Sequence, residues 1–209
     1  MARTVGPLMS LEASGQLAGT IVYSKWKGRP YVRQLVTPSN PRSVLQVSTR
    51  AMMKFLSQAW TPDIDATEQA TWEAAGAASA TSPFNEYIRD NLKRWTQFTA
   101  PSQASPATGG GTSPTFTSLP AVTGGVRQAS FAWTVNALGT GWGLMIFQSK
   151  TTGFTTARDN LVSTVELPAG ASSAILTPVE PGTYFWNFRT FTVEGKLSAA
   201  LGQVTAVVS

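Results

Sequence analysis

The chain has 209 residues, a formal net charge of +5, and neither cysteine nor histidine. This composition excludes a disulfide framework, a Cys/His zinc site, a thiol nucleophile and any Ser-His or Cys-His catalytic unit. Charged residues make up only 13% of the chain, against roughly 25% in an average soluble domain. We expect a non-enzymatic protein without cofactor or metal, whose surface is partly covered by partners.

The N-terminal residues lack the apolar core of a signal peptide, and no stretch approaches the roughly 20 apolar residues of a membrane span. We therefore expect a product that is made in the cytoplasm and has no membrane partner.

Two β-prone segments open the chain. Residues 17–26 and 30–36 are rich in β-branched and aromatic residues, and Gly28 suits a turn between them. They predict a β-hairpin. Its aromatic rings and cations are Tyr23, Lys25, Trp26, Lys27, Arg29, Tyr31 and Arg33.

A helix is predicted next, with Asn40 as its N-cap and Pro41 at its first position. Apolar and small residues recur at helical spacing through Trp60 and predict one buried face. They are Leu45, Ser48, Met52, Phe55, Leu56 and Ala59. Arg42 and Arg50 extend the basic character of the hairpin into this helix, because residues 1–60 contain eight cations and one anion, Glu12.

Two further helices are expected over residues 68–76 and 83–95, the second opened by Ser82 and Pro83. Asp63, Asp65 and Glu68 could form a cation site. Acidic residues at a helix start more commonly cap the helix and complement its dipole, and we favour that role. Glu86 is expected to be an exposed helix acid.

Composition changes after Thr99. Residues 100–124 are rich in Pro, Gly, Ser and Thr and predict a flexible linker. Beyond it, apolar and polar residues alternate in about seven short segments, which predicts a two-sheet β-sandwich. We expect an α+β module (a β-hairpin plus about three helices) over residues 1–99, the linker, and an all-β sandwich over residues 125–209.

Part of the N-terminal half resembles structural proteins of tailed bacteriophages. The hairpin and first helix carry the pattern G…Y-x-x-W-K-G-x-x-x-x-R, then N-P, then Q-x-x-x-R. The matching positions are Gly19, Tyr23, Trp26, Lys27, Gly28, Arg33, Asn40, Pro41, Gln46 and Arg50. A second stretch of the resemblance comprises Trp72, Ser82, Phe84, Asn85 and Asn91, with Gly76 where those proteins have alanine.

The C-terminal half resembles an immunoglobulin/fibronectin type III-like domain. The resemblance rests on Trp133, on Leu176 before Tyr184, and on the turn at 189–198. It implies a tyrosine corner, in which the Tyr184 hydroxyl is tied back to backbone near Leu176.

The cations and rings of the hairpin have three interpretations. Cations that neutralise phosphates and rings that stack on bases would suit nucleic acid. Alternatively, Tyr23, Trp26 and Tyr31 pack on the helices and the cations are merely solvated. We favour a third, a docking surface for an acidic protein, formed by Tyr23, Lys25, Trp26, Lys27, Arg29, Tyr31, Arg33, Arg42 and Arg50.

The phage resemblance implies a protein of the virion, most simply a capsid cement or decoration protein bound to the major capsid protein, or otherwise a neck or tail accessory protein. A homo-oligomer is expected, and a trimer would suit the local three-fold positions of a capsid. Two other classes remain, a nucleic-acid-binding module and a host-adhesion protein that binds carbohydrate. For the latter, Trp142 between two glycines is the candidate glycan contact.

Overall fold

The computed structural model describes residues 3–4, 13–17, 19–27, 29–37 and 42–209. The chain forms two compact units, Met1–Pro41 and Arg42–Ser209. The sequence predicts the first domain boundary near residue 99 instead. The difference arises because the three helices share a hydrophobic core with the sandwich.

The first unit is a four-stranded antiparallel sheet in the order β1-β2-β3-β4. Its strands are Arg3–Thr4, Ala13–Leu17, Ile21–Trp26 and Arg29–Gln34. The predicted hairpin is confirmed as β3 and β4, which pair from Ile21 opposite Gln34 to Trp26 opposite Arg29. Lys27, in the turn, has a φ of 48°, a left-handed conformation. Gly28 lies outside the described residues.

The second unit begins with three helices, α1 (Val44–Ala59), α2 (Ala66–Ser79) and α3 (Pro83–Thr96). The predicted start of α1 is wrong, because Ser43 is its N-cap; Asn40 and Pro41 lie outside the described residues. The predicted buried face of α1 is confirmed except at Leu45, which is 44% exposed. The predicted start of α3 is confirmed, with the Ser82 Oγ accepting a hydrogen bond from the Asn85 amide and Pro83 at the first position.

Two antiparallel sheets follow and form the predicted β-sandwich. In the first sheet, β7 pairs with β10, β5 and β6. The second sheet has the order β12-β11-β8-β9. The strands are β5 (Thr115–Phe116), β6 (Ala121–Gly125), β7 (Gln128–Ala137), β8 (Gly141–Ser149), β9 (Leu161–Glu166), β10 (Gly170–Leu176), β11 (Gly182–Thr192) and β12 (Gln203–Val208), with the short helix η1 (Arg158–Asn160) before β9. The fold is therefore α+β.

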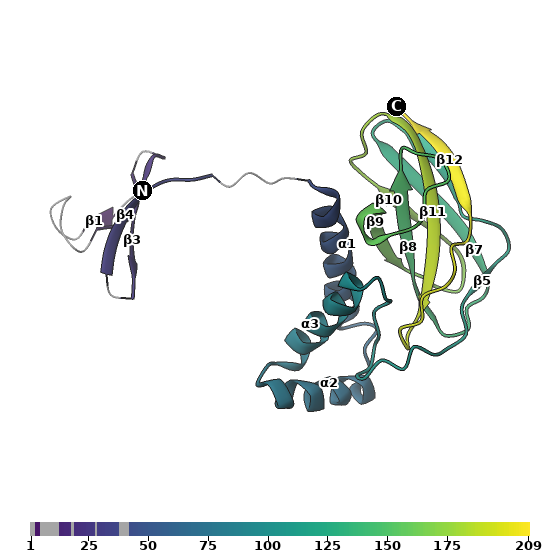
Figure 1. Ribbon diagram of the computed structural model, residues 1–209, viewed down its shortest axis with the longest axis horizontal. Coiled ribbons are helices and arrows are strands. Elements are labelled where there is room, and N and C mark those ends of the chain that lie inside the picture. Colours follow the sequence, from purple (N-terminus) through teal and green to yellow (C-terminus); the bar gives the residue numbers. More distant parts are fainter. Residues whose placement is uncertain (1–2, 5–12, 18, 28, 38–41) are drawn as a thin grey trace. The chain divides into compact units, whose positions relative to one another are not determined.

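The second unit has three layers, because the sheet containing β8 and β11 is covered on both faces (Figure 1). Its inner face packs on the other sheet through Leu144, Ile146 and Trp186. Its outer face packs on the helices through Met145 and Phe147. Every residue of β8 from 142 to 147 is buried. A strand that is apolar on both faces is typical of a sheet buried on both sides.

The segment 100–124, predicted to be a flexible linker, is hydrogen-bonded to other parts of the second unit. Its first part is held by side chains of α2 and α3. The Trp72 Nε1 donates to the Gln103 carbonyl at 2.6 Å, and the Asn91 side chain exchanges two hydrogen bonds with the Ser102 backbone, of 3.0 and 2.7 Å. Further on, the Thr192 Oγ1 donates to the Gly110 carbonyl at 2.8 Å. The segment then supplies β5 and part of β6.

Candidate functional site

The register of the hairpin determines which side chains share a face. Residues directly opposite in an antiparallel pair project to the same side. Trp26 is opposite Arg29, and Tyr31 is opposite Ser24, two residues from Trp26 along β3. Arg33, two residues beyond Tyr31, lies on the same side. Aromatic rings and guanidinium groups therefore share one face, which we call the Trp26 face, defined by Ser24, Trp26, Arg29, Tyr31 and Arg33.

The rings of the Trp26 face are open to solvent. Trp26 is 65% exposed and Tyr31 is 40% exposed. The Lys27 Nζ lies 4.8 Å from the centre of the Trp26 ring, which is a cation-π contact. Tyr23 and Lys25 lie on the opposite face, where Tyr23 is half-buried.

The hairpin is strongly cationic. Lys25, Lys27, Arg29 and Arg33 are exposed, and residues 13–37 contain no Asp or Glu. Arg and aromatic side chains are the groups that most often anchor protein interfaces. The arrangement can therefore bind an acidic, partly apolar surface.

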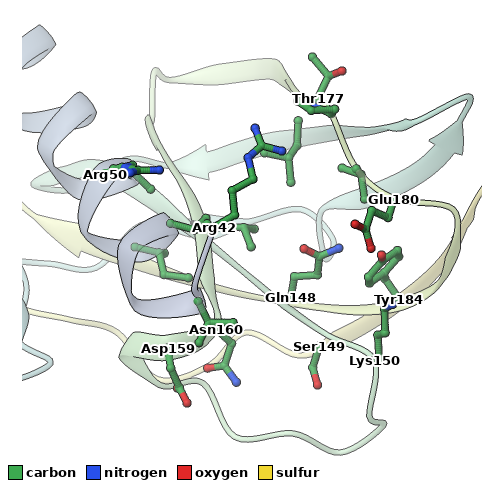
Figure 2. A pocket seen from close by; sticks show the side chains of 18 of the residues that line it. Arg42, Arg50, Gln148, Ser149, Lys150, Asp159, Asn160, Thr177, Glu180 and Tyr184 are labelled. Atoms are coloured by element: carbon green, nitrogen blue, oxygen red, sulfur yellow. The ribbon is translucent and has the colours of Figure 1, made fainter. Parts of the chain in front are cut away.

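Arg42 and Arg50, the other two predicted docking residues, belong to the second unit. Both line a groove of about 730 Å³ between α1 and the sandwich (Figure 2). The groove also contains Lys54, Gln148, Lys150, Asp159, Glu180 and Tyr184. Of these, Lys54 could have been found from the sequence, since it lies one helical turn after Arg50. The others come from separate strands and loops, and no sequence signal joins them.

Trp142, the candidate glycan contact, is 5% exposed, which corrects the expectation of an open ring. Its ring lies 5.0 Å from that of Phe55 on α1 and 5.6 Å from that of Phe191 on β11. Its Nε1 donates a hydrogen bond to Asp63. The flanking glycines admit neighbouring groups instead of exposing the ring: a Cβ on Gly143 would lie 2.3 Å from the Phe191 ring. The Trp142 ring has no free face for a sugar.

Two of the three acidic residues near the start of α2, Asp65 and Glu68, cap the helix as the sequence predicted. The Asp65 carboxylate accepts from the Glu68 amide at 2.8 Å, and the Glu68 carboxylate accepts from the Asp65 amide at 2.9 Å. This reciprocal pair is a capping box. Burial raises the pKa of Glu68, against the lowering effect of the Asp65 amide. The Asp63 carboxylate accepts a hydrogen bond from the Trp142 Nε1.

Glu86 is not the exposed acid that the sequence predicted. Its side chain is buried and accepts hydrogen bonds from the Ser79 Oγ at 2.8 Å and the Thr81 Oγ1 at 2.9 Å. It also forms an ion pair with Arg89. The hydrogen bond from Ser79 is the main cause that lowers the pKa of Glu86. The Thr81 hydrogen bond and the charge of Arg89 lower it further. The arrangement joins the end of α2 to α3 and is structural.

Neither a metal cluster nor a membrane helix is found among the described residues. No group of three or more Asp and Glu side chains lies close enough to hold a metal ion there. Within the same part of the chain, none of the helices has the length and apolar character needed to cross a bilayer.

No family model and no curated protein matches the chain. Solved structures with a weak likeness to this chain include the three that follow. A family 76 glycoside hydrolase from a bovine Bacteroides thetaiotaomicron strain is 13% identical with a TM-score of 0.36, over 46% of this chain and 20% of that one. The CARDB domain of a Pyrococcus furiosus protein, in complex with di-metal ions, is 12% identical with a TM-score of 0.26, over 49% and 97%.

The third structure is a Streptomyces avermitilis α-L-rhamnosidase complexed with L-rhamnose, 16% identical with a TM-score of 0.26, over 47% of this chain and 10% of the enzyme. The chain thus spans a fifth of the length of the family 76 hydrolase and a tenth of the rhamnosidase. TM-scores of 0.26 to 0.36 give no argument about activity or ligand.

Proposed function

We propose that this protein is a non-enzymatic structural component of a phage virion that docks on other virion proteins through the Trp26 face. One observation carries the docking role: Trp26 is 65% exposed on the same face as Arg29 and Arg33. A large exposed ring is a cost in an isolated soluble protein, and such rings mark interaction sites when cations surround them. The virion assignment comes from the sequence resemblance to tailed-phage structural proteins.

The favoured role within the virion is a capsid cement or decoration protein on the major capsid protein. An oligomer, with a trimer favoured, would present several Trp26 faces at once, so that weak contacts combine into stable attachment. Docking across subunit boundaries buries additional surface and would make the shell more resistant to internal DNA pressure. A neck or tail accessory protein is the alternative location.

We also propose that the sandwich is immunoglobulin/fibronectin type III-like. If β5 and β6 together count as the first strand, then strands one, two and five form one sheet and strands three, four, six and seven form the other. This division supports the family resemblance. The expected tyrosine corner is not formed, because within the described residues the Tyr184 hydroxyl makes no hydrogen bond to backbone near Leu176. Such a domain would be displayed outward from the virion.

Copy number in purified particles tests the virion assignment. Quantitative mass spectrometry should find on the order of hundreds of copies for a shell protein, or about a dozen for a neck or tail protein, since each location imposes its own symmetry. Complete absence of the protein from particles would contradict the virion assignment.

A reconstitution assay tests the docking face separately. Particles lacking the protein are mixed with wild type, with the double variant Trp26→Ala/Tyr31→Ala, or with Val126→Ala. Val126 is 78% exposed and belongs to the second unit, so it is the matched control for loss of an exposed apolar side chain. The double variant should lose particle binding while the control keeps it. Equal binding by all three proteins would refute docking through the Trp26 face.

Nucleic acid is the second candidate partner, favoured by exposed rings beside cations on a hairpin without acids. A gel shift with single-stranded oligonucleotide should then weaken steeply as salt rises, because phosphate contacts release counterions. A shift that is absent, or unchanged between low and moderate salt, would rule out this candidate.

A further inference from the structure

The groove of the second unit is a candidate binding site distinct from the Trp26 face. Its volume of about 730 Å³ lies within the range of ligand sites, roughly 300–1,000 Å³. Its lining comes from Arg42 and the α1 residues as far as Lys54, from residues 148–150 at the end of β8 and just after it, from residues 159–162 of η1 and β9, and from the segment between Leu176 and Tyr184. Figure 2 shows Arg42 and Gln148 extending into the hollow.

Positive charge predominates in the groove. Arg42 lies just before α1, Arg50 and Lys54 lie on α1, and Lys150 directly follows β8. The carboxylates in the lining are those of Asp159 and Glu180. With more cations than carboxylates, the groove is complementary to an anionic occupant, to which Arg and Lys can make charge-assisted hydrogen bonds.

The groove is also partly apolar. Val44 and Val47 of α1 face it, and Val44 is 62% exposed. Leu161, Leu176 and Val179 contribute from the sandwich. An occupant with only anionic groups would leave this surface open to water, whereas one with both acidic and apolar groups would cover it.

The same lining argues against nucleic acid. Tyr184 is the aromatic residue of the lining, and it is 6% exposed with the Lys150 Nζ 5.5 Å from its ring centre. It therefore gives bases no open face on which to stack. The Gln148 side chain, which makes no hydrogen bond within the described residues, can donate to and accept from a peptide backbone.

We propose that the groove binds an extended segment of a partner protein in which acidic and apolar residues alternate. The acidic side chains would pair with Arg42 and Lys150, and the apolar ones would pack on Val44 and Val47. This inference rests on the proposed docking function and adds a second contact, in the second unit, to the Trp26 face.

Fluorescence polarisation with the full chain tests the proposal. The probe is a fluorescein-labelled peptide of alternating glutamate and leucine. Arg42→Glu and Lys150→Glu should each weaken its binding on the order of tenfold, because each replaces an attraction by a repulsion at the site. Lys93→Glu changes the net charge equally at an exposed position on α3 outside the groove, and it should bind the peptide as wild type does.

Three results would overturn the groove proposal: no peptide binding by the wild-type chain, equal loss in Lys93→Glu, or displacement of the peptide by an oligonucleotide that binds the same residues more tightly. Thermal unfolding of each variant shows that it is folded. The variant Trp26→Ala should bind the peptide normally. If peptide binding fails while Trp26→Ala/Tyr31→Ala still abolishes particle binding, the groove is wrong and the docking function stands.

Discussion

The Trp142 Nε1 donates a hydrogen bond to the Asp63 Oδ2 at 2.8 Å, between residues 79 positions apart. Trp142 begins the buried run of β8, and Asp63 lies in the loop between α1 and α2. The bond therefore fixes the helical layer to the sandwich at the place where the Trp142 ring contacts Phe55 and Phe191.

Removing the acceptor of this bond should destabilise the second unit. Asp63→Ala leaves the buried indole N–H without a partner, at a cost of about 1–3 kcal/mol in the free energy of unfolding. Asp63→Asn keeps an acceptor oxygen of the same shape and should lose less. Chemical denaturation of both variants measures the difference, and an equally large loss in both would show that charge, not the hydrogen bond, matters at this position.

Gly76 should not tolerate alanine, although it lies inside a helix. Replacing a helical glycine usually stabilises a protein by about 0.5–1 kcal/mol, because alanine has less conformational entropy to lose. A Cβ at position 76, however, would lie 2.8 Å from the Thr81 carbonyl oxygen. We expect Gly76→Ala to lower the melting temperature through a loss of about 1–3 kcal/mol. A rise in melting temperature would contradict this contact.

Asn91 should control whether the segment after α3 stays bound. Its side chain is fully buried and holds both backbone polar groups of Ser102. Asn91→Ala leaves these groups unpaired, with an expected loss of about 2–4 kcal/mol. Limited proteolysis should then cut near residues 100–111 first. Asn85→Ala, at an exposed position on the same helix, should leave the cleavage pattern unchanged.

Glu86 should make stability depend on acid pH. Its folded-state pKa lies below the ordinary value of 4.5, chiefly because Ser79 donates to the carboxylate. A lowered folded pKa stabilises the fold fully above the unfolded pKa, and this contribution is lost as pH falls through the folded value. Glu86→Gln should therefore be less stable than wild type at pH 7, with a gap that narrows below about pH 4.

The control for that experiment is Glu73→Gln, since Glu73 is an exposed acid on α2. Its melting temperature should follow that of wild type across the same pH series. A gap between wild type and Glu86→Gln that stays constant from pH 7 to pH 3 would contradict the assigned role of the Glu86 charge.

The individual helices and strands could be predicted from the sequence, but the packing of the helices on the sandwich could not. Periodicity and turn residues located the hairpin, the three helices and the sandwich strands, and capping chemistry identified Ser82 and Asp65. The packing of the helices on the sandwich was missed because it depends on contacts distant in sequence, such as Phe55 with Trp142. One signal was present: residues 144–147 are apolar without alternation, which a strand solvated on one face does not show.

For the functional residues too, local grouping was predictable and contacts distant in sequence were not. The cations and rings of the hairpin are adjacent in the sequence, so their grouping was predictable, and only their register decides that Trp26 and Arg29 share a face. Residues 100–124 look like a linker because Gly, Pro and Ser dominate them. Their attachment depends on Trp72 and Asn91, whose hydrogen bonds to this segment no composition rule reveals.

The three-layer arrangement determines where the chain can be shortened for study. A fragment beginning at residue 125 would be the natural choice if the helices were a separate module. It would uncover Met145, Phe147 and Phe191 on one side of a sheet, and such a fragment should be recovered as aggregate. A fragment beginning at Arg42 keeps the whole second unit and every residue of both buried clusters, and we expect it to be purified as a folded protein.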